Sequence, residues 1–263
     1  MKNVFFSLFL LLPAVLCAQV AKTDWAKMNL IGKVKCIIET DKQHESIKVS
    51  FNEKGFITEK TLDYDVDGSI DVKSVYSYDS LNKLVTMKTY RDDTTLVTIS
   101  TFLYDALGNR IKENIENLLE SEKGHNANYY YRFDEKGNCI EMRGYNSKGI
   151  LFTTYSYRYD SLGHQLEENW LEANGDTISN AKYSYDNRGN KIKEERTYSS
   201  SDPIYITNYR YNEEGTLIEE ISDNGTTRVN YQLDKKGNCV RIVYSEGLEK
   251  EVVVKRRIDY FKL

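Results

Sequence analysis

Four aspartates within nine residues form the clearest group of possible metal ligands in the sequence. They lie in DYDVDGSIDVK at 63–73 and are Asp63, Asp65, Asp67 and Asp71. Their spacing, with Gly68 between the third and the fourth, matches most of a calcium-binding loop, which takes oxygen ligands at alternate positions and a glycine at its sharp turn. Such a loop also needs a bidentate acid at its twelfth position, where this chain has Ser74. We therefore interpret the stretch as a turn, with calcium as the alternative.

The sequence offers little for catalysis. Its three histidines have no metal-ligand spacing, and no nucleophile elbow, phosphate loop or H-E-x-x-H motif is present. Three acid pairs resemble glycosidase carboxylates: Glu167–Glu168, Glu194–Glu195 and Glu219–Glu220. Neighbouring residues of a strand point to opposite faces, so we interpret these pairs as a solvated sheet surface. We expect no enzymatic activity and no cofactor, apart from the calcium alternative.

The element that carries these residues is a repeat. Eight segments are similar to one another, and most read Y-x-Y-D-x-x-G-N: 49–58, 76–85, 102–111, 131–140, 157–166, 183–192, 209–218 and 231–240. The usual interval between the glycines is 26 residues, with one of 29 and a last of 22, and Asn82 replaces the glycine in the second copy. The chain also contains 21 tyrosines against two prolines, a composition that favours strands.

Each repeat predicts a β-hairpin. The two aromatics are two residues apart and share one face of a strand, the Asp or Asn initiates a turn, and the glycine supplies its left-handed residue. A second turn, such as DVDG at 65–68 or EANG at 172–175, lies midway between the first ones. The prediction is an all-β antiparallel meander of about 16–18 strands, curled into a spiral or barrel-like shell. No linker divides the chain, so residues 19–263 are expected to form a single domain.

The tandem hairpins resemble the YD repeats of RHS-type secreted proteins over about residues 47–247. With its opening LIGKVKCI at 30–37, the chain is similar to the small secreted YD-repeat proteins common in Bacteroidota. The resemblance implies an extended antiparallel sheet that curls into a shell, and it implies little chemistry. Large RHS proteins enclose a toxin domain and carry a proline-rich processing motif, whereas this chain has Pro203 as its only proline after the N-terminal segment. Members of this class are sometimes described as sugar-binding.

The N-terminal segment predicts export. Lys2, an apolar run at 4–15 and small residues ending at Ala18 form the pattern of a signal peptide over residues 1–18. Cys17 raises the alternative of a lipid anchor, although the bulky Leu16 precedes it. We expect a periplasmic, cell-surface or secreted protein with no transmembrane span after signal removal.

The remaining cysteines and the charge distribution limit the possible partners. Cys36, Cys139 and Cys239 cannot all pair, and a Cys36–Cys239 disulfide would require the sheet to close. The formal net charge is −4 and no basic block stands out, so nucleic acid is not an expected partner. An outer-membrane barrel is disfavoured because glutamates such as Glu113 and Glu220 interrupt the apolar face of the strands.

Trp170 is the aromatic singled out for ligand binding. It lies on the strand leading to the EANG turn, where other repeats carry tyrosine or a polar residue. An exposed indole can stack on a sugar ring, and the alternative is that it fills a gap in the core. The sequence thus predicts an exported noncatalytic protein that binds a glycan or a protein partner at the cell envelope. The alternatives are a purely structural scaffold related to the RHS shells and, third, a glycan-active enzyme.

Overall fold

Eighteen strands follow one another along the chain, and each is hydrogen-bonded to its sequence neighbour in one antiparallel sheet. The computed structural model describes residues 22–40, 46–119, 125–199, 202–246 and 250–262. The predicted signal peptide and Cys17 lie outside the described residues. The strands are β1 (Val34–Thr40), β2 (Ser46–Phe51), β3 (Ile57–Asp63), β4 (Val72–Tyr78), β5 (Leu84–Arg91), β6 (Thr95–Tyr104), β7 (Arg110–Asn117), β8 (Ala127–Phe133), β9 (Cys139–Asn146), β10 (Leu151–Tyr159), β11 (Gln165–Glu172), β12 (Thr177–Tyr185), β13 (Lys191–Thr197), β14 (Tyr205–Tyr211), β15 (Leu217–Ser222), β16 (Gly225–Leu233), β17 (Cys239–Glu246) and β18 (Lys250–Tyr260).

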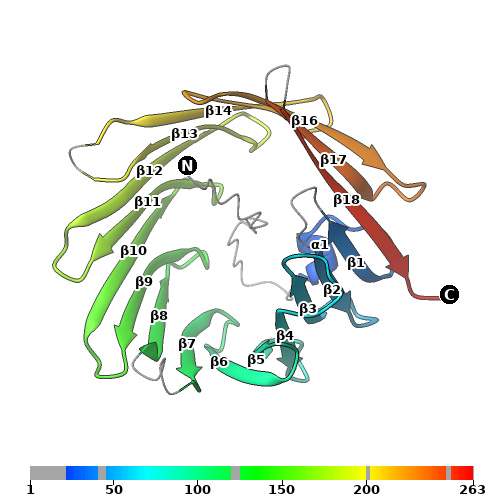
Figure 1. Cartoon of the computed structure of the whole chain (residues 1–263). Helices are drawn as coiled ribbons and strands as arrows, with labels where there is room; N and C mark the ends of the chain where they lie inside the picture. Colours follow the sequence, from blue (N-terminus) through cyan, green and yellow to red (C-terminus); the bar gives the residue numbers. More distant parts are fainter. Residues whose placement is uncertain (1–21, 41–45, 120–124, 200–201, 247–249, 263) are drawn as a thin grey trace.

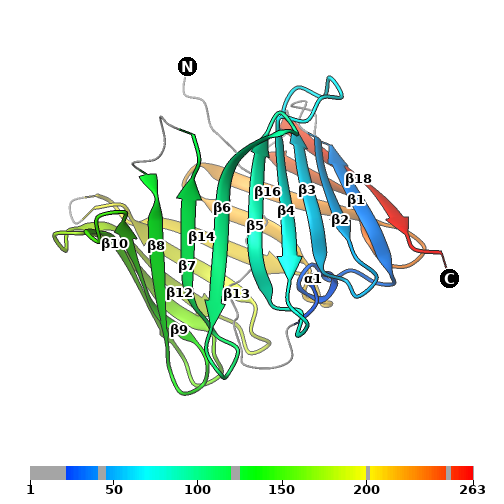
Figure 2. The same cartoon turned by 90° about the horizontal axis from the view of Figure 1, so that it is seen from below.

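The sheet closes into a barrel, as Figure 1 shows end-on and Figure 2 from the side. Strand β1 pairs with β18 from Val34–Tyr260 to Thr40–Lys255, and it also pairs with β2. The predicted meander and barrel-like shell are therefore confirmed, and the question of closure is answered. Closure requires no disulfide here, because the three cysteines of the described residues are free thiols.

An Asp or Asn initiates the turn of each repeat, and in several repeats an Asn four residues later completes it. In the third copy, Asp105 Oδ1 accepts a hydrogen bond from the backbone N–H of Asn109 at 2.8 Å, and Asp105 Oδ2 accepts one from the Asn109 side chain at 2.9 Å. Gly108 lies between them with φ of +90°, and Asn82 takes the same left-handed conformation with φ of +60° in the copy that lacks glycine. The predicted turn chemistry is confirmed, and a bulge follows at the start of the returning strand.

His164 occupies the position of the Asn in its own repeat. Its Nδ1 lies 2.8 Å from Asp160 Oδ2, so the imidazole replaces the amide of the other turns. Its ring also stacks on Tyr185, with centroids 4.8 Å apart. This geometry agrees with the interpretation of His164 as a turn residue.

The second tyrosine of the motif joins one repeat to the preceding one. In four repeats its hydroxyl donates a 2.8 Å hydrogen bond to the carbonyl of the first residue of the preceding returning strand. The pairs are Tyr78–Ile57, Tyr104–Leu84, Tyr185–Gln165 and Tyr211–Lys191. Each bond crosses between hairpins that are separate in sequence, so the tyrosines stabilise the sheet across its repeats.

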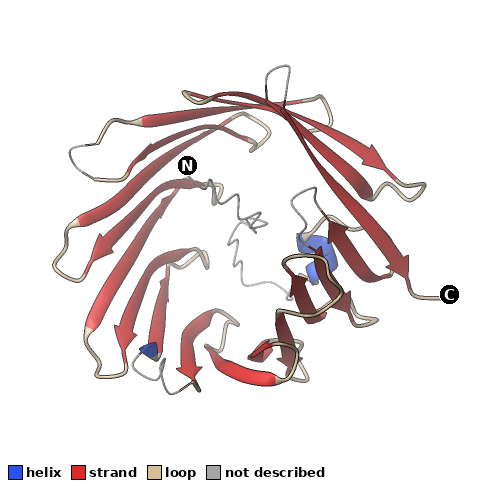
Figure 3. Ribbon diagram, viewed as in Figure 1, coloured by secondary structure: helices blue, strands red, loops and turns tan. Residues whose placement is uncertain are grey.

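The short helix α1 (Asp24–Lys27) identifies the inner face of the barrel. It lies inside the ring of strands beside β1 and β2 (Figures 1 and 3). Asp24 Oδ2 accepts hydrogen bonds from the Ile57 backbone at 2.8 Å and from the Tyr78 hydroxyl at 3.3 Å. The motif tyrosines therefore face the interior, which we call the lumen, and the alternate residues form the outer face.

The best-packed core lies beside the closing seam. Val34, Ile37, Val49 and Phe51 form a buried cluster, against which Trp25 and other half-buried residues pack. Most motif tyrosines are only half-buried, because a barrel of this strand number is too wide for side chains of opposite walls to meet. Within the described ranges, no helix combines the length and the apolar character that a membrane span requires.

Candidate functional site

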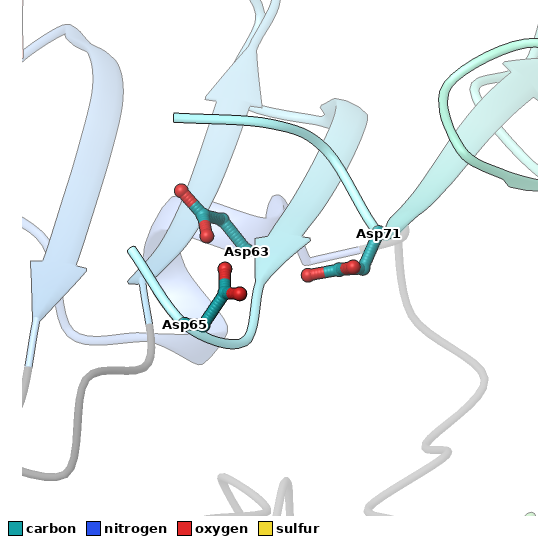
Figure 4. Close-up of side chains that lie close together, drawn as sticks. All are labelled: Asp63, Asp65 and Asp71. Carbon is teal, nitrogen blue, oxygen red and sulfur yellow. The ribbon is translucent and has the colours of Figure 1, made fainter. Parts of the chain in front are cut away.

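Three of the four predicted metal ligands come together in the turn between β3 and β4. One carboxylate oxygen from each of Asp63, Asp65 and Asp71 lies within 4.8 Å of the others, and Figure 4 shows the three side chains pointing toward one another. Asp67 does not join them. Its Oδ1 instead accepts a 2.7 Å hydrogen bond from the backbone N–H of Ser69, so the geometry brings together three of the four residues predicted for a metal site.

The three carboxylates fit a hard cation, since oxygen ligands are what calcium prefers. Part of their capacity is already used, because Asp71 Oδ2 accepts the Tyr64 N–H at 2.7 Å and Asp63 Oδ2 accepts the Gly68 N–H at 3.1 Å. Asp63 Oδ1 is buried and has no hydrogen-bond partner among the residues that the structure describes. Asp63, Asp65 and Asp71 would hold the ion, and calcium binding by this turn remains a prediction.

Trp170 lies on the lumenal face. It pairs across the strands with Tyr155, and the two rings stack with centroids 5.4 Å apart and an interplanar angle of 12°. Its Nε1 donates a 2.8 Å hydrogen bond to Thr153 Oγ1. One face of the indole and its only polar atom are thus engaged within the wall. A role for Trp170 in ligand binding would require the ligand to enter the lumen.

The sheet divides the acid pairs between its two faces. Glu167 and Glu219 point outward, where they pair with Arg158 at 3.2 Å and Arg210 at 2.9 Å. Glu168, Glu194 and Glu220 lie on the lumenal face, each opposite a motif tyrosine. The interpretation as solvated surface therefore describes only the outer member of each pair.

The lumenal acids are held in a network with two cations. Glu194 accepts a hydrogen bond from Lys191 Nζ at 2.8 Å and another from Arg196 Nε at 2.9 Å. Arg196 also lies 3.8 Å from Glu168 and donates to the Tyr183 hydroxyl at 3.2 Å. The charge of this part of the wall is therefore largely compensated within it.

The pKa values of two of these acids are shifted in opposite directions. Burial opposes the ionisation of Glu194, but the hydrogen bonds and charges of Lys191 and Arg196 outweigh it and hold its pKa below the usual range. Burial raises the pKa of Glu220, and the nearby Glu194 adds to the increase although Lys191 opposes it. Divergent carboxyl pKa values are found in acid–base pairs. Glu194 and Glu220 do not line the groove on the outer face that is described below. We therefore interpret their network as part of the structure of the barrel wall.

A groove of about 610 Å³ lies on the outer face over β8 and β9. We call it the Tyr130 groove, and its lining residues include Asn128, Tyr130, Arg132, Glu141, Arg143 and Tyr145, together with Asn146 of the following turn. Tyr130 is 45% exposed, and its ring meets that of Tyr145 edge-on with centroids 5.7 Å apart. Aromatic rings flanked by two amides form a surface suited to a flat, hydroxyl-rich ligand.

One glutamate serves both arginines of this groove. Glu141 Oε2 lies 3.0 Å from Arg143 Nη2 and 3.5 Å from Arg132 Nη2. The negative charge of Glu141 and then a hydrogen bond with Tyr145 raise the pKa of Arg143. The guanidinium groups are thus oriented by Glu141 while their side chains stay 50% and 65% exposed.

The sequence contains a signal for this groove that was not among the predicted site residues. Tyr129, Tyr130 and Tyr131 are consecutive, and in a strand of period two the middle residue must face away from the other two. Tyr129 and Tyr131 face the lumen, so Tyr130 is forced outward. Trp170 was predicted as a ligand-binding residue from its type alone, whereas its position in the alternation of the strand places it on the lumenal face.

Comparisons with known proteins support the fold. No protein-family model matches the sequence, and no curated protein matches it. The chain is similar to the crystal structure of a porin-like protein from Bacteroides uniformis, with a TM-score of 0.50 and 11% identity over 86% of this chain and 98% of that one. At this identity the likeness concerns the fold alone. The class of molecule that fold and register define is a closed, antiparallel β-hairpin-repeat barrel.

Two further structures are similar at lower scores. A porin-like protein from Bacteroides vulgatus matches with a TM-score of 0.43 and 15% identity, over 88% of this chain and all of that one. The TcdB2–TccC3 structure without its hypervariable C-terminal region matches with a TM-score of 0.35 and 15% identity, over 86% of this chain and 15% of that one.

Proposed function

We propose that this protein is an exported, noncatalytic barrel that stands in water at the cell envelope and binds a carbohydrate through the Tyr130 groove. The observation that carries the proposal is the pair of tyrosines on the outer face, flanked by Asn128 and Asn146. Aromatic rings contact the apolar faces of sugars, and amides bond their hydroxyls. Trp170 has no comparable free surface on the outer face.

The outer face supports the aqueous part of the proposal. Arginines that are more than 60% exposed come from strands around much of the barrel: Arg132, Arg158, Arg210, Arg228 and Arg257. An arginine facing the middle of a bilayer costs about 2–4 kcal/mol, whereas in water it costs nothing. A barrel with this exterior is suited to solvent.

Export and a relation to the YD-repeat proteins of the RHS type belong to the same proposal. Both rest on the N-terminal sequence pattern and on the eightfold hairpin motif. The proposal of a noncatalytic protein rests on the placement of the acids, since Glu194 is engaged by two cations in the wall. The alternative is a scaffold element without a ligand. The continuous hydrogen bonding of the barrel wall is equally compatible with that role.

A glycan-array screen of residues 19–263, in buffer with calcium, tests the proposal. We expect binding to a related set of glycans that Tyr130→Ala abolishes and Trp170→Ala leaves unchanged. Tyr205→Ala is the control for the loss of an exposed, paired tyrosine on the other face, because Tyr205 is 46% exposed and meets Tyr198 edge-on but lies opposite Arg196 on the lumenal side. A blank array with folded protein would refute the proposal and favour the scaffold. Loss of binding with Trp170→Ala alone would move the site to the lumen.

A further inference from the structure

We infer that the Tyr130 groove selects acidic carbohydrates, with the carboxylate of a uronic acid held by Arg132 and Arg143. This inference rests on the proposed function and specifies the class of its ligand. It goes beyond sugar binding in general, because a neutral sugar would have no use for the two guanidinium groups that line the same groove.

The charges of the groove favour an anion. Two arginines share a single carboxylate, Glu141, and Lys112 adds a third cation, with its Nζ 5.1 Å from the centre of the Tyr130 ring. Lys112 makes no ion pair with any residue the structure describes. Three positive charges against one negative charge leave a local excess of two in a protein whose formal net charge is −4. The excess is therefore a property of this surface and not of the whole chain.

The arginines keep hydrogen-bonding capacity for a ligand. A guanidinium carries five N–H donors, and the contacts of Arg132 and Arg143 with Glu141 use only a few of the ten. Their planar forks match the geometry of a carboxylate, which they bind with two parallel hydrogen bonds. Because Glu141 already orients both groups, less side-chain freedom is lost when the anion binds.

The aromatic rings add the requirement for a sugar. Tyr130 pairs across the strands with Arg143, and Tyr145 pairs with Asn128, so each ring lies directly opposite a polar partner on the same face. A sugar ring lying on either tyrosine would place its exocyclic groups toward the arginines and the amides. A simple anion would use the arginines and leave the tyrosines without a role.

Isothermal titration calorimetry with two forms of one trisaccharide tests the inference. The probes are trigalacturonic acid and its methyl ester, which keeps the ring stereochemistry and removes the charge. We expect the acid to bind at least about ten-fold more tightly, and to lose this advantage in Arg132→Gln/Arg143→Gln. Arg210→Gln, at an exposed arginine paired with Glu219 elsewhere on the outer face, is the matched control. Circular dichroism checks that each variant is folded.

The outcomes separate the inference from the proposed function. Equal binding of acid and ester, lost in Tyr130→Ala, would overturn acid selectivity and leave carbohydrate binding intact. Equally tight binding of triglutamate would also overturn the inference, because the site would then recognise charge without a sugar. If folded protein bound neither trisaccharide, the inference would be refuted, and carbohydrate binding would be judged on the array alone.

Discussion

Replacing Glu194 by glutamine removes the one carboxylate that Lys191 and Arg196 share in the lumenal wall. Its side chain is 17% exposed, and it accepts two charge-assisted hydrogen bonds, at 2.8 and 2.9 Å. An intact bond of this kind contributes about 1.5–3 kcal/mol, and partial exposure of both cations reduces the sum. We expect Glu194→Gln to lower the free energy of unfolding by about 2 kcal/mol. At this chain length that corresponds to a fall in Tm of about 4–8 °C.

Glu220→Gln should act in the opposite direction at neutral pH. Burial and the nearby Glu194 raise the pKa of the Glu220 carboxyl, so the folded state binds its proton more tightly than the unfolded state. The free energy of unfolding therefore falls as the pH rises above the usual value of 4.5. Glutamine removes this loss, and we expect a gain of up to about 1 kcal/mol at pH 7. At pH 4 the carboxyl is largely protonated in both states, and the gain should disappear.

Glu194 has the reverse pH dependence. Its pKa lies below the usual range, so the stability that it contributes is present above pH 4.5 and is lost as the pH falls through its folded-state pKa. The deficit of Glu194→Gln should therefore be smaller at pH 3 than at pH 7. Urea unfolding of both variants and the wild type, followed by circular dichroism at pH 3, 4 and 7, measures all three effects. This account of the wall would be refuted if Glu194→Gln left the free energy of unfolding unchanged, or if Glu220→Gln lowered it by about 1 kcal/mol at pH 7.

Three further predictions follow from other parts of the barrel. Tyr185→Phe should lower the free energy of unfolding by about 1 kcal/mol, because it removes the 2.8 Å hydrogen bond to the Gln165 carbonyl. Tyr205→Phe is the control, because the Tyr205 hydroxyl bonds no residue that the structure describes. Equal losses of stability in urea unfolding would contradict the role of the inter-repeat tyrosine. Gly144→Ala should lower the free energy of unfolding by about 1–3 kcal/mol, since the new Cβ would lie 2.7 Å from the nearest side-chain atom. An unchanged thermal midpoint would show that the neighbouring side chains move aside without a loss of stability. Calcium should bind the 63–71 turn with a Kd of about 0.1–1 mM, typical of extracellular sites. In a calorimetric titration with calcium, Asp63→Asn should abolish the heat of binding. If the wild type gave no heat, the stretch would be a turn without a metal site.

The repeat made most of the fold predictable from the sequence. The residues that build each of these turns lie within five positions of one another, so their geometry follows from local chemistry, as the turn from Asp105 to Asn109 illustrates. The alternation of each strand then places the tyrosines on one face. Asn82 follows the same logic, because asparagine tolerates the left-handed conformation better than other residues with a side chain.

Closure and the candidate sites depend on contacts that local chemistry does not determine. Strands β1 and β18 carry no hairpin motif at their seam, and their pairing joins residues more than 200 positions apart. The arrangement of the aspartates required the turn to be built, since Asp67 is used by Ser69 while Asp71 reaches back to Tyr64. The Tyr130 groove was not predicted, because its residues are common in type and are distinguished only by the face of the sheet that they occupy.

Closure of the meander also has a consequence for how such a protein can evolve. An open stack of repeats has two exposed ends that need dedicated terminal units, whereas a ring hides every strand edge and needs none. Each internal unit adds two strands, or about 10 Å of circumference. Duplication or loss of one unit would thus change the bore by a fixed step while re-forming the same β1–β18 seam. The width of the lumen is, in this sense, a count of repeats that a single recombination event can change.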